Sequence, residues 1–142
     1  MNINSGDRYQ YRLKRSHIQL LQASLLSGNM AEDAWDKWQS SVNLDFVDNL
    51  SHQLLPQLYQ NLTEQGLGGR DLPRLRGIYR RTWYANQLAI KLLKEILSSL
   101  GEVKVEAIII GDAANLDKFY GDRCHPISSL QLLVHAEHFE VA

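Results

Sequence analysis

The sequence has little cysteine and proline, and it has no long apolar run. Its one cysteine, Cys124, has no second thiol with which to form an internal disulfide or a zinc site of the Cys/His kind. The longest apolar runs, such as residues 107–110, are far shorter than the roughly 20 residues that cross a bilayer. We therefore expect a cytoplasmic protein that holds no metal or other cofactor and makes no membrane contact.

An excess of charge of one sign is also missing. The 142 residues include 15 Lys and Arg and 16 Asp and Glu, so the formal net charge is -1. No global field therefore favours nucleic acid, and any basic surface must be local. Apolar residues make up 44% of the chain, which is enough for one domain with a core of its own.

Helical spacing of apolar residues dominates up to about residue 100. The longest such pattern predicts a helix that begins after Asp71, with Pro73 in its first turn, and ends near Gly101. Such a helix is roughly 40 Å long at about 1.5 Å per residue. Shorter helices are predicted over residues 9–27 and 30–41. A third, short helix is predicted to start with Asp45 as its cap, and a fourth to have Pro56 in its first turn.

The pattern changes after Gly101. Alternating apolar and charged residues from Val103 lead into residues 108–110 and predict a strand that becomes buried. Residues 130–134 predict a second strand, with short helices over 113–120 and from 135 to the end. The expected fold class is α+β: a helical region over 1–100 and a small α/β unit over 101–142, in one continuous folded body.

Two strands make a poor sheet by themselves. Their open edges and apolar faces need cover, and the chain ends soon after the second strand. Either a partner completes the sheet, or the sequence is the front part of a longer fold. We expect a homodimer or another protein partner, with residues 128–134 at or near the contact.

Several segments, in their order along the chain, carry a resemblance to a known family. Residues 54–62 read LLPQLYQNL, the long helix contains Asn86 followed by leucines, and residues 119–122, 126–128 and 132–134 read FYGD, PIS and LLV. Together they resemble the uncharacterised nucleotidyltransferase-like family found in many bacteria. The resemblance covers most of residues 18–142, and it implies a nucleotidyltransferase-type α/β unit at the end of the chain.

The positions that carry that family's chemistry differ here. Members typically read Lys-Gly-x-x-Leu after the first strand and Asp-x-Asp in the second, whereas residues 111–115 read GDAAN and residues 129–131 read SLQ. Paired carboxylates on one face of a strand hold Mg²⁺ against phosphate, and Ser129 and Gln131 bring no charge to that face. Gly111 stands where the family lysine is expected. Asp112 puts a negative charge where a triphosphate would lie, although its favoured role is to cap the next helix.

The sequence therefore predicts a degenerate nucleotidyltransferase-like protein that acts as a non-catalytic protein-interaction module. Two alternatives stay open. One is an active nucleotidyltransferase whose ligands lie outside the usual motif or come from a missing C-terminal part. The other is nucleic-acid binding through the helix that carries Arg70 to Arg81.

That helix contains the candidate binding residues Arg74, Arg76, Arg80 and Arg81, with Arg70 just before it. They would contact phosphate if all five arginines shared one exposed face, with nearby aromatic residues stacking on bases. A solvated helix face with the aromatic residues turned to the core is the favoured interpretation.

Two smaller features complete the candidates. Cys124 has Arg123 and His125 beside it, which would lower its pKa, but an ordinary loop thiol is favoured. His135 and His138 are spaced as metal ligands on a helix, but a metal site near the end of the chain without a thiol is disfavoured.

Overall fold

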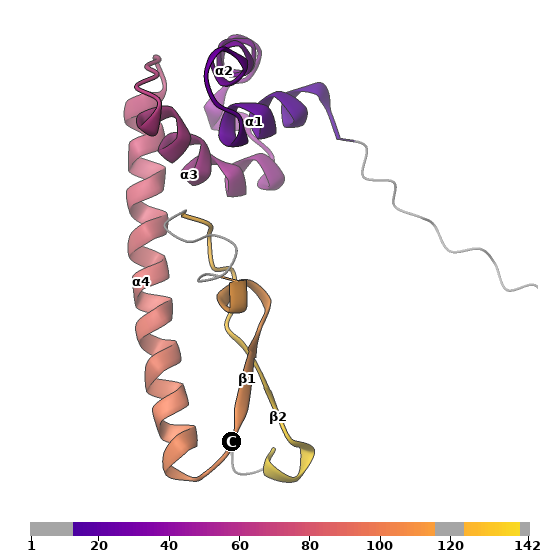
Figure 1. The fold of residues 1–142 in the computed structure, drawn as a ribbon, viewed down its shortest axis with the longest axis vertical. Helices are drawn as coiled ribbons and strands as arrows, with labels where there is room; N and C mark the ends of the chain where they lie inside the picture. Colours follow the sequence, from indigo (N-terminus) through magenta and orange to yellow (C-terminus); the bar gives the residue numbers. More distant parts are fainter. Residues whose placement is uncertain (1–12, 116–123, 140–142) are drawn as a thin grey trace, which may run out of the picture.

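The computed structural model describes residues 13–115 and 124–139. In chain order the main elements are α1 (Arg15–Leu25), α2 (Asn29–Ser41), α3 (Asn49–Glu64), α4 (Leu72–Glu102), β1 (Ala107–Ile110) and β2 (Gln131–Val134). Figure 1 shows α1 to α3 gathered at one end of α4, while β1 and β2 lie beside its other half. The fold is α+β, as predicted. Among the described residues, no helix has the length and apolarity needed to span a membrane.

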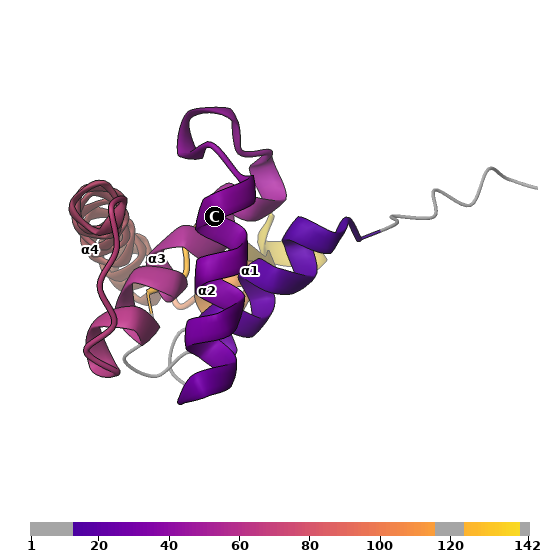
Figure 2. The same cartoon turned by 90° about the horizontal axis from the view of Figure 1, so that it is seen from above.

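The hydrophobic core lies among α1, α2, α3 and the beginning of α4. Its largest buried side chains are Leu20 of α1, Trp35 and Trp38 of α2, Leu58 of α3 and Leu75 of α4. Figure 2 shows α1, α2 and α3 packed together with α4 beside them. The expected helix over 30–41 is confirmed. The helix expected over 9–27 is shorter, Arg15–Leu25, with Lys14 and Leu26 as its caps, and residues 9–12 lie outside the described part.

The boundary of α3 corrects one prediction. Pro56 was expected in the first turn of a helix, but α3 begins at Asn49 and Pro56 lies fully buried inside it. The cap is Asp48, whose Oδ1 accepts a hydrogen bond from the Ser51 N–H at 2.9 Å. Asp45 caps no helix: it lies in the 3₁₀ turn Leu44–Phe46, which Asn43 caps. Core packing by this helix offsets the backbone hydrogen bond that Pro56 removes.

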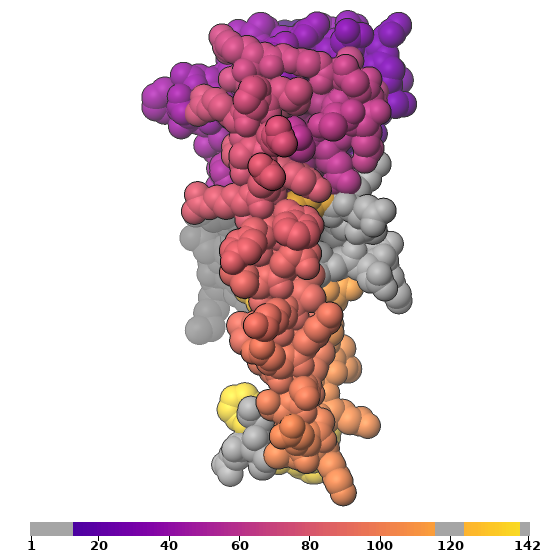
Figure 3. Space-filling view, turned by 90° about the vertical axis from the view of Figure 1, so that its left-hand side faces the viewer, coloured from indigo at the N-terminus to yellow at the C-terminus, as the bar shows by residue number. Residues whose placement is uncertain are grey.

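Helix α4 is longer than expected. It passes Gly101 and has 31 residues, which gives about 46 Å at about 1.5 Å per residue. Asp71 precedes it, but its buried side chain makes no capping bond and lies 3.5 Å from the Arg70 guanidinium. Figure 3 shows α4 along one whole side of the molecule, with no other described element laid over it.

The two strands form an antiparallel sheet. Ala107 pairs with Val134 and Ile110 pairs with Gln131. Alternate residues face the two sides, so one face is half-buried and the other exposes Ile108, Ile110 and Leu133. Strand β1 begins at Ala107 and not near Val103, because residues 103–104 form the turn out of α4, where Lys104 adopts a φ of 58°. The expectation that the strand becomes buried is wrong, since Ile108 and Ile110 are 64% and 38% exposed.

Short 3₁₀ turns replace the two small helices that were expected in this unit. They are Gly111–Asn115 after β1 and Ala136–His138 after β2. Residues 116–120 of the first expected helix and 140–142 of the second lie outside the described residues.

Candidate functional site

The four motif positions identified in the sequence lie together at one end of the sheet. Gly111 follows β1, and Gln131 begins β2 opposite Ile110. A Cβ on Gly111 would lie 3.4 Å from the Gln131 side chain, and the φ of 73° at Gly111 favours glycine. Gln131 Nε2 in turn donates to Ser129 Oγ at 3.0 Å. The turn after β1 and the start of β2 therefore form a single small site.

Asp112 is the carboxylate of this site, and it is already engaged. One of its oxygens, Oδ2, accepts hydrogen bonds from the hydroxyl of Ser128 and from the Ser128 N–H, the latter at 3.1 Å. These bonds, the hydroxyl first, lower the pKa of Asp112, so it stays ionised near neutral pH. Instead of capping a following helix, Asp112 ties the turn after β1 to the segment before β2.

The polar groups of the site do not converge as metal ligands do. Ser129 and Gln131 bond to each other, and Asp112 bonds to Ser128. Across residues 13–115 and 124–139, no three His, Cys, Asp or Glu side chains are grouped to hold a metal ion. His135 caps the 3₁₀ turn Ala136–His138, so the two histidines are not on the expected helix, and their ring centroids are 6.1 Å apart.

The segment that leads to Ser129 is held by two helices. Asn86 of α4, 7% exposed, donates from Nδ2 to the His125 carbonyl at 2.8 Å and accepts from the Ile127 N–H at 3.0 Å. Gln60 of α3 accepts from the Cys124 N–H at 3.1 Å. Sequence reasoning did not assign Asn86 this anchoring role. The signal was a polar residue on the stripe of α4 that also carries Leu75, Leu93 and Leu100.

Cys124 lies in this anchored segment and is buried, with 5% of its surface exposed. Burial raises the pKa of the thiol to about 11. The alternative of a reactive, low-pKa thiol is therefore wrong, and the favoured interpretation of an unreactive thiol fits this environment. Arg123, one of the two residues expected to lower the pKa, lies outside the described part.

The five arginines do not form one face. Arg70 pairs with Asp71, and Arg74 pairs with Asp45 beside a hollow that α2 and residues 42–44 also line. Arg76 and Arg80 line a different hollow, against α3. The arrangement does not meet the condition set for nucleic-acid binding, namely five arginines on one exposed face. Trp83 and Tyr84 are also 51% and 62% exposed, so they are not turned to the core as expected.

The outer face of the sheet exposes apolar side chains. Ile108 and Leu133 lie opposite each other and are 64% and 56% exposed, and Ile110 on the same face is 38% exposed. A groove of about 780 Å³ continues from Ile108 and Leu133 to Ala136. Burial of such side chains is favourable, so this face is suited to contact with another apolar surface.

No protein-family model, curated protein or solved structure matches this chain.

Proposed function

We propose that this chain is a nucleotidyltransferase-like module that does not transfer nucleotides and that acts by self-association through its two-stranded sheet. The observation that carries the first half is the state of Asp112. It is the single carboxylate among Gly111, Asp112, Ser129 and Gln131, and Ser128 already donates two hydrogen bonds to one of its oxygens. Nucleotidyl transfer needs at least two carboxylates around Mg²⁺, and a hydroxyl and an amide bonded to each other do not replace them.

The outer face of the sheet supports the second half. Ile108 and Leu133 form a directly opposed pair on a face that no described element covers, and β1 and β2 each have one neighbour among the described strands. Apolar burial contributes about 25 cal/mol per Å². In a two-fold dimer the same patch is buried on both copies, so a modest patch counts twice.

A second copy of the chain is the occupant that fits these features best. A two-fold axis brings Ile108 and Leu133 of one copy against the same pair of the other, so apolar groups meet apolar groups. Unpaired backbone N–H and C=O groups at the strand edges can pair in the same arrangement. We therefore expect a dimer whose contact is centred on Ile108 and Leu133 and includes part of residues 128–134.

Light scattering on the purified chain tests the association. At ~100 μM we expect a mass twice that of the 16.2-kDa chain, falling on dilution because the dimer obeys mass action. Leu133→Lys places a charge in the contact and should give a monomer. Leu25→Lys is the matched control, because Leu25 is 58% exposed and lies on α1, away from the sheet.

Two results would contradict self-association. One is a wild-type chain that remains a monomer at ~100 μM. The other is a dimer that Leu133→Lys leaves intact, which would place the contact elsewhere on the molecule. Circular dichroism on both variants separates lost association from lost folding.

A further inference from the structure

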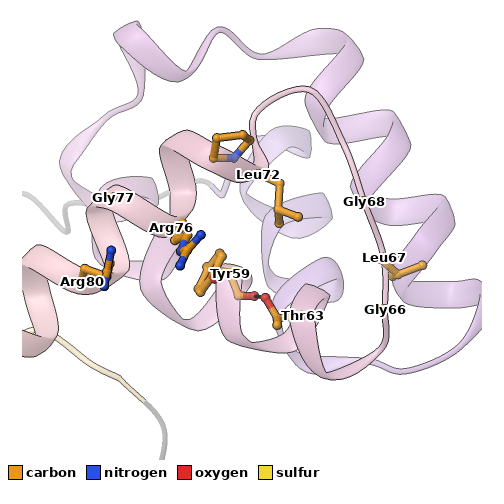
Figure 4. A pocket seen from close by; sticks show the side chains of 10 residues that line it. Tyr59, Thr63, Gly66, Leu67, Gly68, Leu72, Arg76, Gly77 and Arg80 are labelled. Atoms are coloured by element: carbon orange, nitrogen blue, oxygen red, sulfur yellow. Dashed lines mark hydrogen bonds between the residues drawn. The ribbon is translucent and has the colours of Figure 1, made fainter.

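A second feature lies at the opposite end of the molecule from the sheet. The end of α3, residues 66–68 of the following loop and the beginning of α4 line an open hollow of about 670 Å³. Small-molecule sites commonly have volumes of roughly 300–1,000 Å³. Figure 4 shows this hollow from close by, with residues from both helices and from the loop around it.

One wall of the hollow is apolar and aromatic. Tyr59 of α3 and Leu72 of α4 both line it, and Figure 4 shows the Tyr59 ring beside the Arg76 side chain. The Tyr59 ring packs against Tyr79 with 5.1 Å between centroids, which fixes its position. Thr63 donates its hydroxyl hydrogen to the Tyr59 carbonyl at 2.8 Å, so its oxygen remains an acceptor toward the hollow. A flat apolar group would find a preformed surface here.

The other wall carries positive charge without a counter-charge. Arg76 and Arg80 lie one helical turn apart and line the hollow, and among the described residues neither makes a hydrogen bond or ion pair. Like charges at this spacing destabilise a helix. Arg70 and Arg74, by contrast, are both paired with aspartates. Within the described part of the chain, no Asp or Glu lines the hollow. Burial raises the pKa of Tyr79, and the charge of Glu64 adds only a smaller contribution.

Gly77 lies between these two arginines, in the interior of α4. Glycine weakens a helix interior relative to alanine, so its presence is unfavourable for α4 alone. A Cβ added there would meet no atom within 4 Å. The space beside Gly77 is therefore open, and a ligand in the hollow can approach the helix backbone at this residue.

We infer that this hollow binds a small organic phosphate with an aromatic body. Two guanidinium groups one turn apart match a phosphate dianion, which accepts paired hydrogen bonds from arginine. The aromatic body would lie against Tyr59 and Leu72. The inference is independent of the proposed dimer, because the sheet contributes no residue to the hollow.

NMR titration of the ¹⁵N-labelled chain with phenyl phosphate tests this site. We expect saturable shifts at the amides of residues 59–80, with a Kd on the order of 1 mM or tighter for a ligand of this size. Inorganic phosphate lacks the ring and phenol lacks the charge, so each should bind at least about tenfold more weakly. Similar affinity for inorganic phosphate would show an ion site without the aromatic component and would overturn the inference as stated.

Three variants locate the binding. Arg76→Ala combined with Arg80→Ala should raise the Kd by about tenfold or more. Arg81→Ala removes the same charge from the same helix but not from the hollow, and should change the Kd by no more than about twofold. Gly77→Leu should remove binding by filling the open space while leaving the melting temperature equal or higher, because leucine favours helix.

Three results would overturn the inference. The first is that no amide resonance shifts with phenyl phosphate up to ~10 mM. The second is that Arg81→Ala and the double variant change the Kd equally, and the third is that Gly77→Leu binds as wild type does. Single-stranded DNA serves as the comparison probe. If it binds through Arg76 and Arg80 while phenyl phosphate does not, the surface serves nucleic acid and not a small phosphate.

Discussion

Replacement of Asn86 by alanine should loosen the segment that leads to Ser129 and Gln131. Asn86 makes two hydrogen bonds to this segment, to the His125 carbonyl and from the Ile127 N–H, and is 7% exposed. Each neutral bond contributes about 1 kcal/mol net, and a buried group left without its partner costs about 1–3 kcal/mol. Asn86→Ala should therefore lower the free energy of unfolding by about 2–4 kcal/mol.

Urea unfolding followed by circular dichroism measures this loss. Gln87→Ala is the matched control, because Gln87 is the next residue of α4 and is exposed, so its unfolding free energy should stay within about 0.5 kcal/mol of wild type. Cys124 supplies a local readout, since it belongs to the same segment and is 5% exposed. A thiol reagent should modify it faster in Asn86→Ala than in Gln87→Ala. Equal unfolding midpoints and equal modification rates would refute the anchoring role of Asn86.

Three further predictions concern acid stability, thiol reactivity and core packing. Hydrogen bonds, above all the one from the Ser51 N–H, hold the pKa of Asp48 well below its ordinary value. Ionised Asp48 therefore stabilises the fold at pH values above its unfolded pKa of about 4. Between pH ~5 and ~2, wild type should lose more stability than Asp48→Asn in acid-unfolding measurements, and equal losses would contradict this. Cys124, with its pKa raised to about 11 by burial, should react with a thiol reagent at pH ~8 far more slowly in the folded chain than in denaturant; equal rates would exclude its burial. Trp35 Nε1 donates to a backbone carbonyl at 2.8 Å, whereas Trp38 Nε1 makes no hydrogen bond among the described residues. Trp35→Phe should therefore lower the free energy of unfolding in urea by about 1 kcal/mol more than Trp38→Phe does. The reverse order would refute this.

The fold could be predicted from sequence where periodicity and stop signals agree. Helix α2 carries regular apolar spacing and follows Gly28, its N-cap, and α4 carries the same spacing but passes the expected stop at Gly101 by one residue. Pro56 misled the prediction because proline usually marks a first turn, whereas here tertiary packing keeps it inside α3. Asp48 carries the true start signal, a capping aspartate directly before the helix.

The candidate site was predictable in part. The proximity of Gly111 and Gln131 follows from the pairing of two strands, each of which the apolar pattern predicted. The division of the arginines was not predictable, because Arg74 finds its partner Asp45 29 residues away in sequence. The hollow beside Arg76 and Arg80 likewise depends on the packing of α3 against α4, which no local pattern encodes.

Incubation of the chain with labelled nucleoside triphosphates and Mg²⁺ or Mn²⁺ tests the central claim most directly. Because Ser129 and Gln131 carry no charge and Ser128 already engages Asp112, the site lacks the paired carboxylates that the transfer needs, and we expect no label on the protein or on an added acceptor. The variant Asp112→Asn serves to trace any signal to the motif. Label that is transferred by wild type and lost in Asp112→Asn or Ser129→Ala would show that the site transfers nucleotides and would contradict the account.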